Sequence, residues 1–251
     1  MTFVTILTGA SRGIGAAIAE GYLNESKSNC LIAVARTKPS LSKLVDTYGG
    51  DRVGIVVGDV CDPQTSASAI ELAVKKFGKL NAIIANAGVL DPVEHIENAD
   101  LDKWRKLYDI NFFSVVGLVQ QALPELRKTN GRVVAVLSGA SETAYDGWGA
   151  YGSSKAALNQ FINSLAFEEP SVSAISIAPG VVDTEMQSDI RSKFGTNMTK
   201  SIEKFMDLHE SKRLLDPRVP GNVYWKLALK GWESNLNGKY LRFDDELLKY
   251  L

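Results

Sequence analysis

The chain has 251 residues, of which 45% are hydrophobic and 23% are charged, so it is long and apolar enough to bury a full core. Its 28 basic and 29 acidic residues nearly cancel, which argues against a nucleic-acid-binding or membrane-binding surface. Two cysteines, Cys30 and Cys61, are too few for a disulfide framework, and no apolar run reaches the length of a membrane span. We therefore expect one cytoplasmic α/β domain over residues 1–251, with both thiols reduced and partly buried.

The first predicted element is an apolar strand over residues 3–7, which leads through a glycine-rich turn into a helix. The turn, T-G-A-S-R-G-I-G at 8–15, has the spacing of a dinucleotide-binding turn, and the flanking strand and helix make that interpretation specific. Gly9 permits the tight turn, Gly13 lets backbone amides approach a pyrophosphate, and Gly15 lets the helix pack closely on the strand. The predicted cofactor contacts in this turn are Gly9, Ser11, Arg12, Gly13, Ile14 and Gly15.

The second predicted strand, over residues 30–35, ends in A-V-A-R, about twenty residues beyond the glycine turn. An NAD-binding unit usually presents an acidic residue there to the ribose 2′-hydroxyl, but the corresponding residue is Ala35, followed by Arg36. A guanidinium can bind a 2′-phosphate through charge-assisted hydrogen bonds, and Arg12 supplies a second cation. We therefore predict NADP(H) as the cofactor, with Thr37 adding a hydroxyl group.

Further short apolar runs alternate with helical stretches along the rest of the chain, a pattern that predicts a parallel sheet covered on both faces. We expect a Rossmann-type doubly wound α/β fold. Long segments with apolar periodicity, at 101–128 and 150–168, are predicted helices on one face of the sheet. The remaining predicted strands are 53–58, 80–85, 132–137, 172–177 and, as a final strand, 238–243.

Tyr151 and Lys155 in Y-G-S-S-K are four residues apart, which places both on one face of the second long helix. A phenol has a reference pKa of about 10, and an adjacent ammonium favours the phenolate, so we expect Lys155 to lower the pKa of Tyr151. Ser138, at the end of a predicted strand, can hold a carbonyl oxygen while Tyr151 gives or takes its proton. The combination predicts interconversion of a carbonyl and an alcohol. His95 and His209 are isolated from other ligand-type residues, and no metal is expected.

Several motifs resemble, in order and spacing, the short-chain dehydrogenase/reductase family over roughly residues 1–185, and within it the sepiapterin reductase and benzil reductase branch with its fungal members. They are T-G-A-S-R-G-I-G, N-A-G at 86–88, Asn111, Ser138, Y-G-S-S-K and P-G-V-V-D-T at 179–184. The resemblance implies that NADPH delivers hydride to a carbonyl group held by Ser138 and Tyr151. It also implies that Lys155 binds the nicotinamide ribose, and that Asn111 kinks its helix and holds a water that links Lys155 to solvent.

The same resemblance assigns further cofactor contacts to the loops that follow the predicted strands. Asp59 and Val60 correspond to the pair at the adenine. The loop under the adenine ribose is Asn86, Ala87 and Gly88. The residues at the nicotinamide carboxamide are Pro179, Gly180, Val182 and Thr184.

Residues 185–220 mix polar and apolar side chains without a strand pattern. In the family this segment forms a small helical flap over the substrate, and the alternative is a surface excursion. Met186 begins the flap, while Tyr145 and Trp148 precede the catalytic helix, so we expect an apolar, aromatic substrate mouth. Such a mouth suits an apolar or aromatic 1,2-diketone, reduced to the α-hydroxy ketone. The flap is expected to include Met186, Phe194, Phe205 and Met206.

Two other functions compete with diketone reduction. A sepiapterin reductase, by the family resemblance, anchors the pterin with a carboxylate on the last strand, but Arg242 occupies the aligned position and cannot accept a hydrogen bond. Asp244 or Asp245 would substitute if the alignment shifts by two or three residues. The second alternative is a regulatory protein that binds NADP(H) without turnover. The intact set of Asn111, Ser138, Tyr151 and Lys155 argues against it.

The two long predicted helices also bear on assembly. The family usually packs these helices against their symmetry mates in a two-fold, four-helix contact. Their apolar residues exceed what one sheet face obviously covers, so we expect a homodimer. The residues concerned are Phe112, Phe113, Val116 and Phe161.

Overall fold

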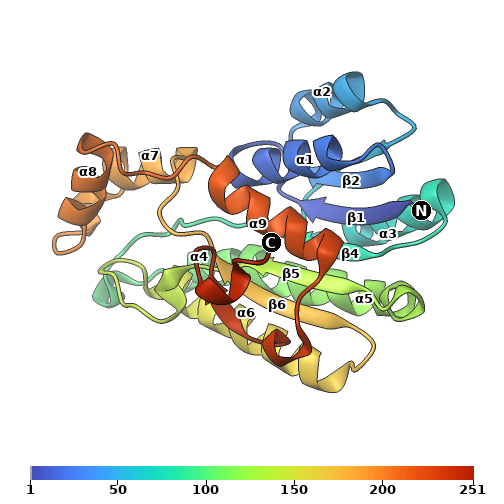
Figure 1. The fold of residues 1–251 in the computed structure, drawn as a ribbon. Helices are drawn as coiled ribbons and strands as arrows, with labels where there is room; N and C mark the ends of the chain where they lie inside the picture. The colour runs from blue at the N-terminus through green and yellow to red at the C-terminus, as the bar shows by residue number, and fades with distance from the viewer. Residues whose placement is uncertain (1) are drawn as a thin grey trace.

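A seven-stranded parallel sheet forms the centre of the computed structural model, which describes residues 2–251 (Figure 1). The strand order is β3-β2-β1-β4-β5-β6-β7, so it reverses between β1 and β4. The expected Rossmann-type doubly wound fold is therefore confirmed, and such sheets bind ligands outside the carboxyl ends of the strands, at the point of reversal. The strands, each within two residues of a predicted one, are β1 (Phe3–Thr8), β2 (Asn29–Ala35), β3 (Val53–Val57), β4 (Ala82–Ala85), β5 (Arg132–Val136), β6 (Ser173–Ala178) and β7 (Tyr240–Arg242).

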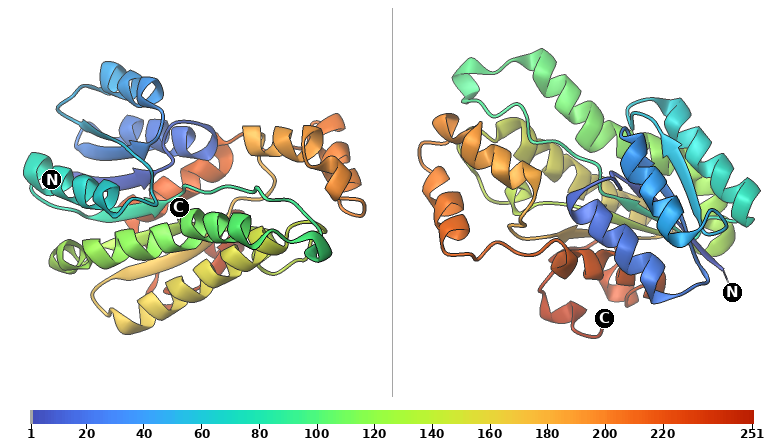
Figure 2. Two further views of the ribbon diagram at one scale, coloured as in Figure 1. Left: turned by 180° about the vertical axis from the view of Figure 1, so that it is seen from behind. Right: turned by 90° about the horizontal axis from the view of Figure 1, so that it is seen from above.

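Helices cover both faces of the sheet, as the two views in Figure 2 show. One face carries α1 (Gly13–Glu25), α2 (Lys38–Tyr48) and α9 (Arg218–Lys230). The opposite face carries α3 (Pro63–Phe77), α5 (Ser114–Thr129) and α6 (Gly149–Glu168). Short 3-10 turns lie at Ile96–Asn98, Gly139–Ser141, Gly195–Asn197, Ser234–Leu236 and Glu246–Leu248.

The strands form because their side chains are buried on both faces. All seven residues of β2 are buried, which explains why the strand reads as an uninterrupted apolar run rather than as an alternation. Tyr22 and Tyr224 are the largest fully buried side chains, and their hydroxyls donate to the backbone carbonyls of Phe3 and Ile177 at 2.8 and 2.9 Å. The polar end of each ring is thus satisfied inside the core.

The long helix expected over 101–128 is divided into three parts, which corrects the sequence-based prediction. α4 (Leu101–Tyr108) is followed by a π-helical turn, Asp109–Phe113, and then by α5. Asn111 is fully buried in that turn and hydrogen-bonds to the loop after β4. Wide turns of this kind are frequent at functional sites, because they redirect one side chain without ending the helix.

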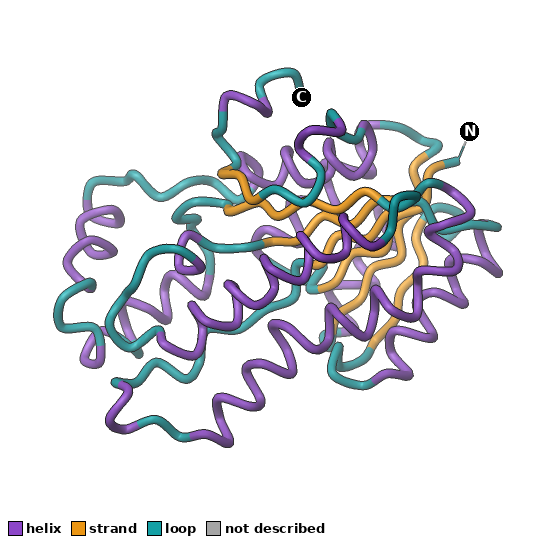
Figure 3. Tube along the Cα trace, turned by 90° about the horizontal axis from the view of Figure 1, so that it is seen from below, coloured by secondary structure: helices purple, strands orange, loops and turns teal. Residues whose placement is uncertain are grey.

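A flap rises beyond the carboxyl ends of the strands. It contains α7 (Glu185–Ser192) and α8 (Ile202–Glu210), which lie at the side toward which the β1 arrow points in Figure 1. The loops drawn in teal gather at the same end of the sheet in Figure 3. A third apolar cluster joins the flap to the segments 89–93 and 140–151. The flap is therefore packed onto the body of the protein rather than projecting as a loose surface excursion.

Candidate active site

Ser138, Tyr151 and Lys155 come together at the carboxyl end of β5. Ser138 follows that strand and starts a 3-10 turn, in which its hydroxyl accepts a hydrogen bond from the amide of Ala140 at 3.1 Å. Tyr151 lies in the first turns of α6, and its hydroxyl is hydrogen-bonded to that of Ser138. The exposed fractions of Tyr151 and Lys155 are only 7% and 4%. The hydroxyl groups of Ser138 and Tyr151 thus lie side by side, and Lys155 places a cation near them.

Lys155 holds its ammonium group inside the protein. Its Nζ donates to the carbonyl oxygen of Val136 at 2.9 Å and lies 5.9 Å from the centre of the Tyr151 ring. Burial lowers the pKa of Lys155 from 10.5 to about 8, because the charged form loses its hydration. A side chain at Gly88 would stand 3.5 Å from the same Nζ, so the glycine leaves room for the ammonium.

The expected net lowering of the Tyr151 pKa is not found in this structure. Burial raises the pKa of Tyr151, and the hydrogen bond from Ser138 offsets only part of that rise. The helical spacing correctly indicated that Tyr151 and Lys155 are neighbours, but spacing carries no information on desolvation. A raised pKa keeps the phenol protonated at neutral pH, which is the form a proton donor requires.

Asn111 fastens the π-helical turn to two other parts of the site. Its Oδ1 accepts from the amide of Val89, and its Nδ2 donates to the Val89 carbonyl, both at 2.8 Å. Nδ2 also lies 3.2 Å from the hydroxyl of Ser154, one residue before Lys155. These bonds occupy the side chain of Asn111 with protein partners. Its expected role in holding a water stays a prediction.

The glycine turn has the backbone conformation that its sequence requires. Gly9 and Gly13 have φ values of 68° and 53°, in the region that favours glycine. A side chain at Gly15 would overlap the carbonyl oxygen of Gly9. Asn86 braces the turn, because its Nδ2 donates to the carbonyls of Thr8 and Gly9 at 2.9 and 3.1 Å.

Arg12 is paired within the protein. Its guanidinium forms an ion pair with Glu185, the first residue of α7. Thr184 adds a second contact between the flap and the turn, since a Cβ at Gly13 would stand 3.2 Å from its methyl group. The Ser11 and Gly13 amides lie at the start of α1, whereas the side chain of Ile14 packs against the core. A phosphate at the turn therefore competes with Glu185 for Arg12.

The residues after β2 and β3 lie at the rim of the same crevice. Arg36 and Thr37 are exposed, and Ala35 is only 6% exposed and packs in the core. Asp59 accepts a hydrogen bond from the amide of Cys61 at 3.0 Å, while Val60 lines a small cavity beside β1. Cys61 is exposed rather than partly buried, which corrects the sequence-based expectation for one of the two thiols.

The loop after β6 links the sheet to the flap. Gly180 has a φ of 75°, and Asp183 donates its amide to the Leu215 carbonyl at 2.8 Å. Thr184 caps α7 through its hydroxyl, which accepts from the amide of Gln187 at 3.4 Å. Pro179 to Thr184 thus run from the sheet edge to the glycine turn, while Val182 bridges to Leu215. Their expected contact with the nicotinamide carboxamide stays a prediction.

Aromatic side chains fill the space between Tyr151 and the flap. The Trp148 ring meets that of Tyr151 edge-on at 5.5 Å and stacks on Phe205 at 5.4 Å. Its Nε1 donates to the sulfur of Met198 at 3.2 Å, and Tyr145 packs on Trp148 at 4.8 Å. Trp148 is 7% exposed, so in this conformation it is a core residue of the flap cluster rather than the wall of an open mouth.

The four residues expected in the flap all lie in it. Met186 and Phe194 pack against the third cluster and Phe205 is buried in it, whereas Met206 is 38% exposed. Met198 is a residue of this cluster that sequence reasoning missed. Little in the sequence indicates it, because a single methionine in a polar stretch does not form a periodic apolar pattern with its neighbours.

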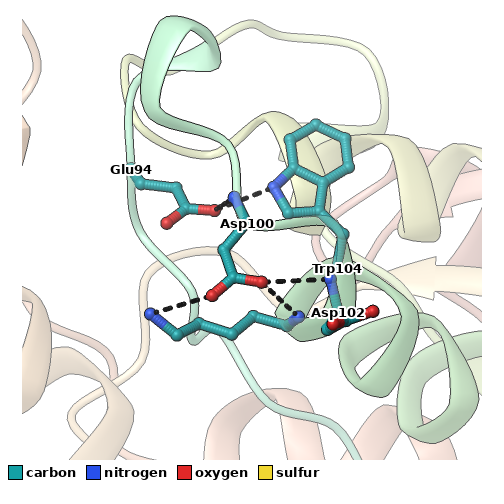
Figure 4. A network of polar contacts seen from close by, with 5 residues as sticks. Glu94, Asp100, Asp102 and Trp104 are labelled. Atoms are coloured by element: carbon teal, nitrogen blue, oxygen red, sulfur yellow. Dashed lines mark hydrogen bonds and ion pairs between the residues drawn. The ribbon is translucent and has the colours of Figure 1, made fainter.

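The largest cavity described, with a volume of about 650 Å³, lies on the outer face of α6 and does not include Ser138, Tyr151 or Lys155. Its walls are the segments 94–97 and 140–149. Glu94 fixes one wall, because its Oε1 accepts from the Asp100 amide at 2.8 Å and from Trp104 Nε1 at 3.1 Å (Figure 4). The cavity is separated from the catalytic hydroxyls, so we assign it no part in the chemistry.

Two further findings concern metal ligands and membrane-spanning helices. Within residues 2–251, no three histidine, cysteine or acidic side chains gather in the manner of a metal site. None of the helices in this range is both long and apolar enough to span a membrane.

Comparison with known proteins agrees with this geometry. The model of the short chain dehydrogenase family matches residues 3–195. The chain belongs to this family. A short chain dehydrogenase/reductase from Saccharomyces cerevisiae has a crystal structure with a TM-score of 0.97 and 47% identity, over 99% of this chain and 98% of that one. This short chain dehydrogenase is thus an oxidoreductase that acts on CH–OH and C=O groups.

Two relatives carry a more specific name. The benzil reductase ((S)-benzoin forming) of Saccharomyces cerevisiae is 46% identical over 98% of this chain and 97% of its own. The benzil reductase ((S)-benzoin forming) of Bacillus cereus is 32% identical over 96% of this chain and 98% of its own. A second solved structure, described as a cytoplasmic protein from Saccharomyces cerevisiae, has a TM-score of 0.84 and 46% identity over 98% of both chains.

Replacing Lys155 by methionine should stabilise the cofactor-free protein. The difference between an unfolded pKa of 10.5 and a folded pKa of about 8 corresponds to roughly 3 kcal/mol of stability lost at pH 7, where both states are charged. As the pH rises from about 8 toward 10.5, the folded state alone loses the proton and the wild type regains this energy. The advantage of Lys155→Met should therefore be largest at neutral pH and shrink toward pH 10.

Urea unfolding of both proteins between pH 7 and 10 measures the effect, with Lys79→Met, at a half-buried position, as the control. A variant less stable than the wild type at pH 7 would show that Lys155 is stabilised by its neighbours rather than strained by burial.

Proposed function

We propose that the protein is a cytoplasmic, NADPH-dependent carbonyl reductase that converts an apolar 1,2-diketone into the α-hydroxy ketone. The observation that carries the proposal is the hydroxyl pair of Ser138 and Tyr151, backed by the buried ammonium of Lys155. The relatives named as benzil reductases support the diketone as substrate.

The proposed chemistry assigns one task to each side chain. Bound NADPH supplies a hydride to the carbonyl carbon. Ser138 and Tyr151 donate hydrogen bonds to the carbonyl oxygen, and Tyr151 passes its proton to that oxygen as negative charge develops there. The Lys155 ammonium stabilises the phenolate that remains until a proton from solvent restores the phenol. One carbonyl, one hydride from NADPH and one proton are consumed, and one alcohol and NADP⁺ are formed.

The residues present fit a dinucleotide. The turn before α1 leaves no space for side chains at Gly9 or Gly15, and the helix amino terminus directs its amides and positive dipole toward a phosphate. Arg36 is exposed at the end of β2, where no acidic residue opposes a 2′-phosphate. Arg12 also becomes available to the 2′-phosphate once its ion pair with Glu185 is broken. Gly88 leaves room beside Lys155 for the nicotinamide ribose.

The surroundings of Tyr151 favour an apolar substrate. Leu90, Val93, Trp148 and Ile190 belong to the cluster that contains it. A 1,2-diketone with hydrocarbon substituents is largely apolar. It is also electrophilic, because each carbonyl withdraws electrons from the other. After one reduction the remaining ketone loses that activation, so the reaction stops at the α-hydroxy ketone.

Pterin reduction is less well supported. Arg242, on β7, pairs with Asp244 at 3.0 Å, and Asp245 accepts from the Leu247 amide at 3.0 Å. Both acids that would replace the expected pterin anchor are therefore engaged within the protein.

We also propose a homodimer through the outer faces of α5 and α6. Phe113 and Phe167 are 56% and 89% exposed there, which is unusual for phenylalanine. Phe112 and Phe161, in contrast, meet edge-on at 6.4 Å and pack against the core, so they do not supply the surplus apolar surface expected of them.

The substrate proposal is tested by measuring kcat/KM for benzil and an alkyl diketone beside sepiapterin, a simple aldehyde, a sugar and a steroid. We expect the diketones to be preferred, because the apolar site has few partners for polar substituents. A preference for the sugar or the steroid, or for sepiapterin by more than about tenfold, would refute the proposal.

Tyr151→Phe should reduce kcat by about 100-fold or more, because the ring is kept and only the transferable proton is lost. NADPH affinity should change little. The matched control is Tyr145→Phe, which removes a hydroxyl that bonds to Lys204 at 2.8 Å rather than to Ser138. Retention of more than about a tenth of the wild-type kcat would mean that Tyr151 is not the proton donor.

The wild-type protein should bind NADPH at least about tenfold more tightly than NADH. Because Ala35 is buried, an aspartate there would lie in the core, and Arg36→Asp is the better reversal of charge. That change should abolish or reverse the preference through repulsion of the 2′-phosphate. Glu185→Gln should strengthen NADPH binding, since it frees Arg12.

Fluorescence titration with both coenzymes measures these preferences, and Lys79→Asp, at the opposite end of the sheet, controls for net charge. Equal affinity of the wild type for NADPH and NADH would overturn the coenzyme assignment.

A further inference from the structure

Gln187 has a buried hydrogen-bond donor without a partner. Its side chain is 2% exposed, and its Nε2 makes no hydrogen bond within the described residues. Burying an unpaired donor is costly, and nearly all such groups in native proteins have a protein, water or ligand partner. The glutamine lies in α7, three residues after Thr184 of the loop assigned to the nicotinamide.

Arg191 fixes which end of the amide is free. Its guanidinium donates to Gln187 Oε1 at 2.9 Å and to the Gln187 backbone carbonyl at 3.1 Å. A rotated amide would set its NH₂ group against a guanidinium, donor against donor, so the observed orientation is the stable one. The arginine thus holds the oxygen and leaves the NH₂ group available.

The buried side of α7 belongs to the catalytic region. Gln187 and Ile190 are the two buried residues of this helix, and Ile190 belongs to the same apolar cluster as Tyr151 and Trp148. Met186, beside Gln187, packs against that cluster as well. An unpaired N–H donor is therefore buried on α7 beside two residues that pack in the apolar cluster of Tyr151.

We propose that Gln187 Nε2 donates a hydrogen bond to the second carbonyl oxygen of the bound 1,2-diketone, an inference that rests on the proposed diketone reduction. Ser138 and Tyr151 hold the carbonyl that is reduced. Gln187 holds the neighbouring oxygen, which fixes which carbonyl carbon and which face meet the hydride. A ketone that has a methylene group instead of the second carbonyl leaves the Nε2 donor of Gln187 unpaired. Such a ketone is therefore a poorer substrate.

Benzil and deoxybenzoin form a matched pair of probes, since both have two phenyl rings and only one has the second carbonyl. In the wild type, kcat/KM should favour benzil over deoxybenzoin. Gln187→Met keeps the length of the side chain without the donor, and it should reduce that ratio by about tenfold. Arg191→Met leaves the donor but frees the amide, so a smaller loss is expected. Gln64→Met, at an exposed position on α3, is the control.

Two readouts separate this role from folding or cofactor binding, namely the NADPH dissociation constant and the melting temperature of Gln187→Met. Both should stay close to the wild-type values. An equal loss for both ketones, or a matching loss of NADPH affinity, overturns the inference while leaving diketone reduction in place. A wild type that reduces neither benzil nor an alkyl diketone overturns both proposals.

Discussion

The buried ammonium of Lys155 is the constraint around which the catalytic region is arranged. A charge removed from water needs polar partners, and the one here is the carbonyl of Val136, the last residue of β5, two residues before Ser138. The glycine at position 88 leaves space beside the Nζ. One cation thus joins the carboxyl end of β5 to the face of α6. Burying this charge lowers the stability of the folded protein, but it places a positive charge where the chemistry needs one.

Asn111 shows why part of the site was predictable from sequence and part was not. The sheet, the glycine turn and the pairing of Tyr151 with Lys155 depend on contacts between near neighbours in the chain, so period and spacing reveal them. The bonds of Asn111 join residues 22 and 43 positions apart, and they convert one apparent helix into two helices with a π-helical turn between them. Hydrophobic periodicity passes through such a turn almost unchanged. The sequence pattern therefore could not show it.

Desolvation was the second property beyond the reach of sequence. Tyr151 and Lys155 were correctly placed together, but both are buried, and burial shifts the two pKa values in opposite directions. Trp148, in contact with Tyr151, stacks on Phe205 of the flap, 57 residues later in the chain (205 − 148 = 57). A segment without regular periodicity gives no indication of where it will pack. The pKa of Tyr151 consequently depends in part on the packing of the flap, the segment in which the sequence has no regular hydrophobic pattern.

The first turn of α7 connects the two binding tasks of the site. Glu185 holds Arg12 of the glycine turn, Thr184 touches Gly13, and Gln187 offers its donor to the substrate layer. A 2′-phosphate that takes Arg12 away from Glu185 acts on the same helical turn that carries Gln187. Because a short helix moves as a unit, a change at its cofactor end is passed to its substrate end without a longer chain of contacts. The Arg12–Glu185 pair and the unpaired donor of Gln187 therefore belong to one element, which would connect the proposed coenzyme site with the proposed ketone site.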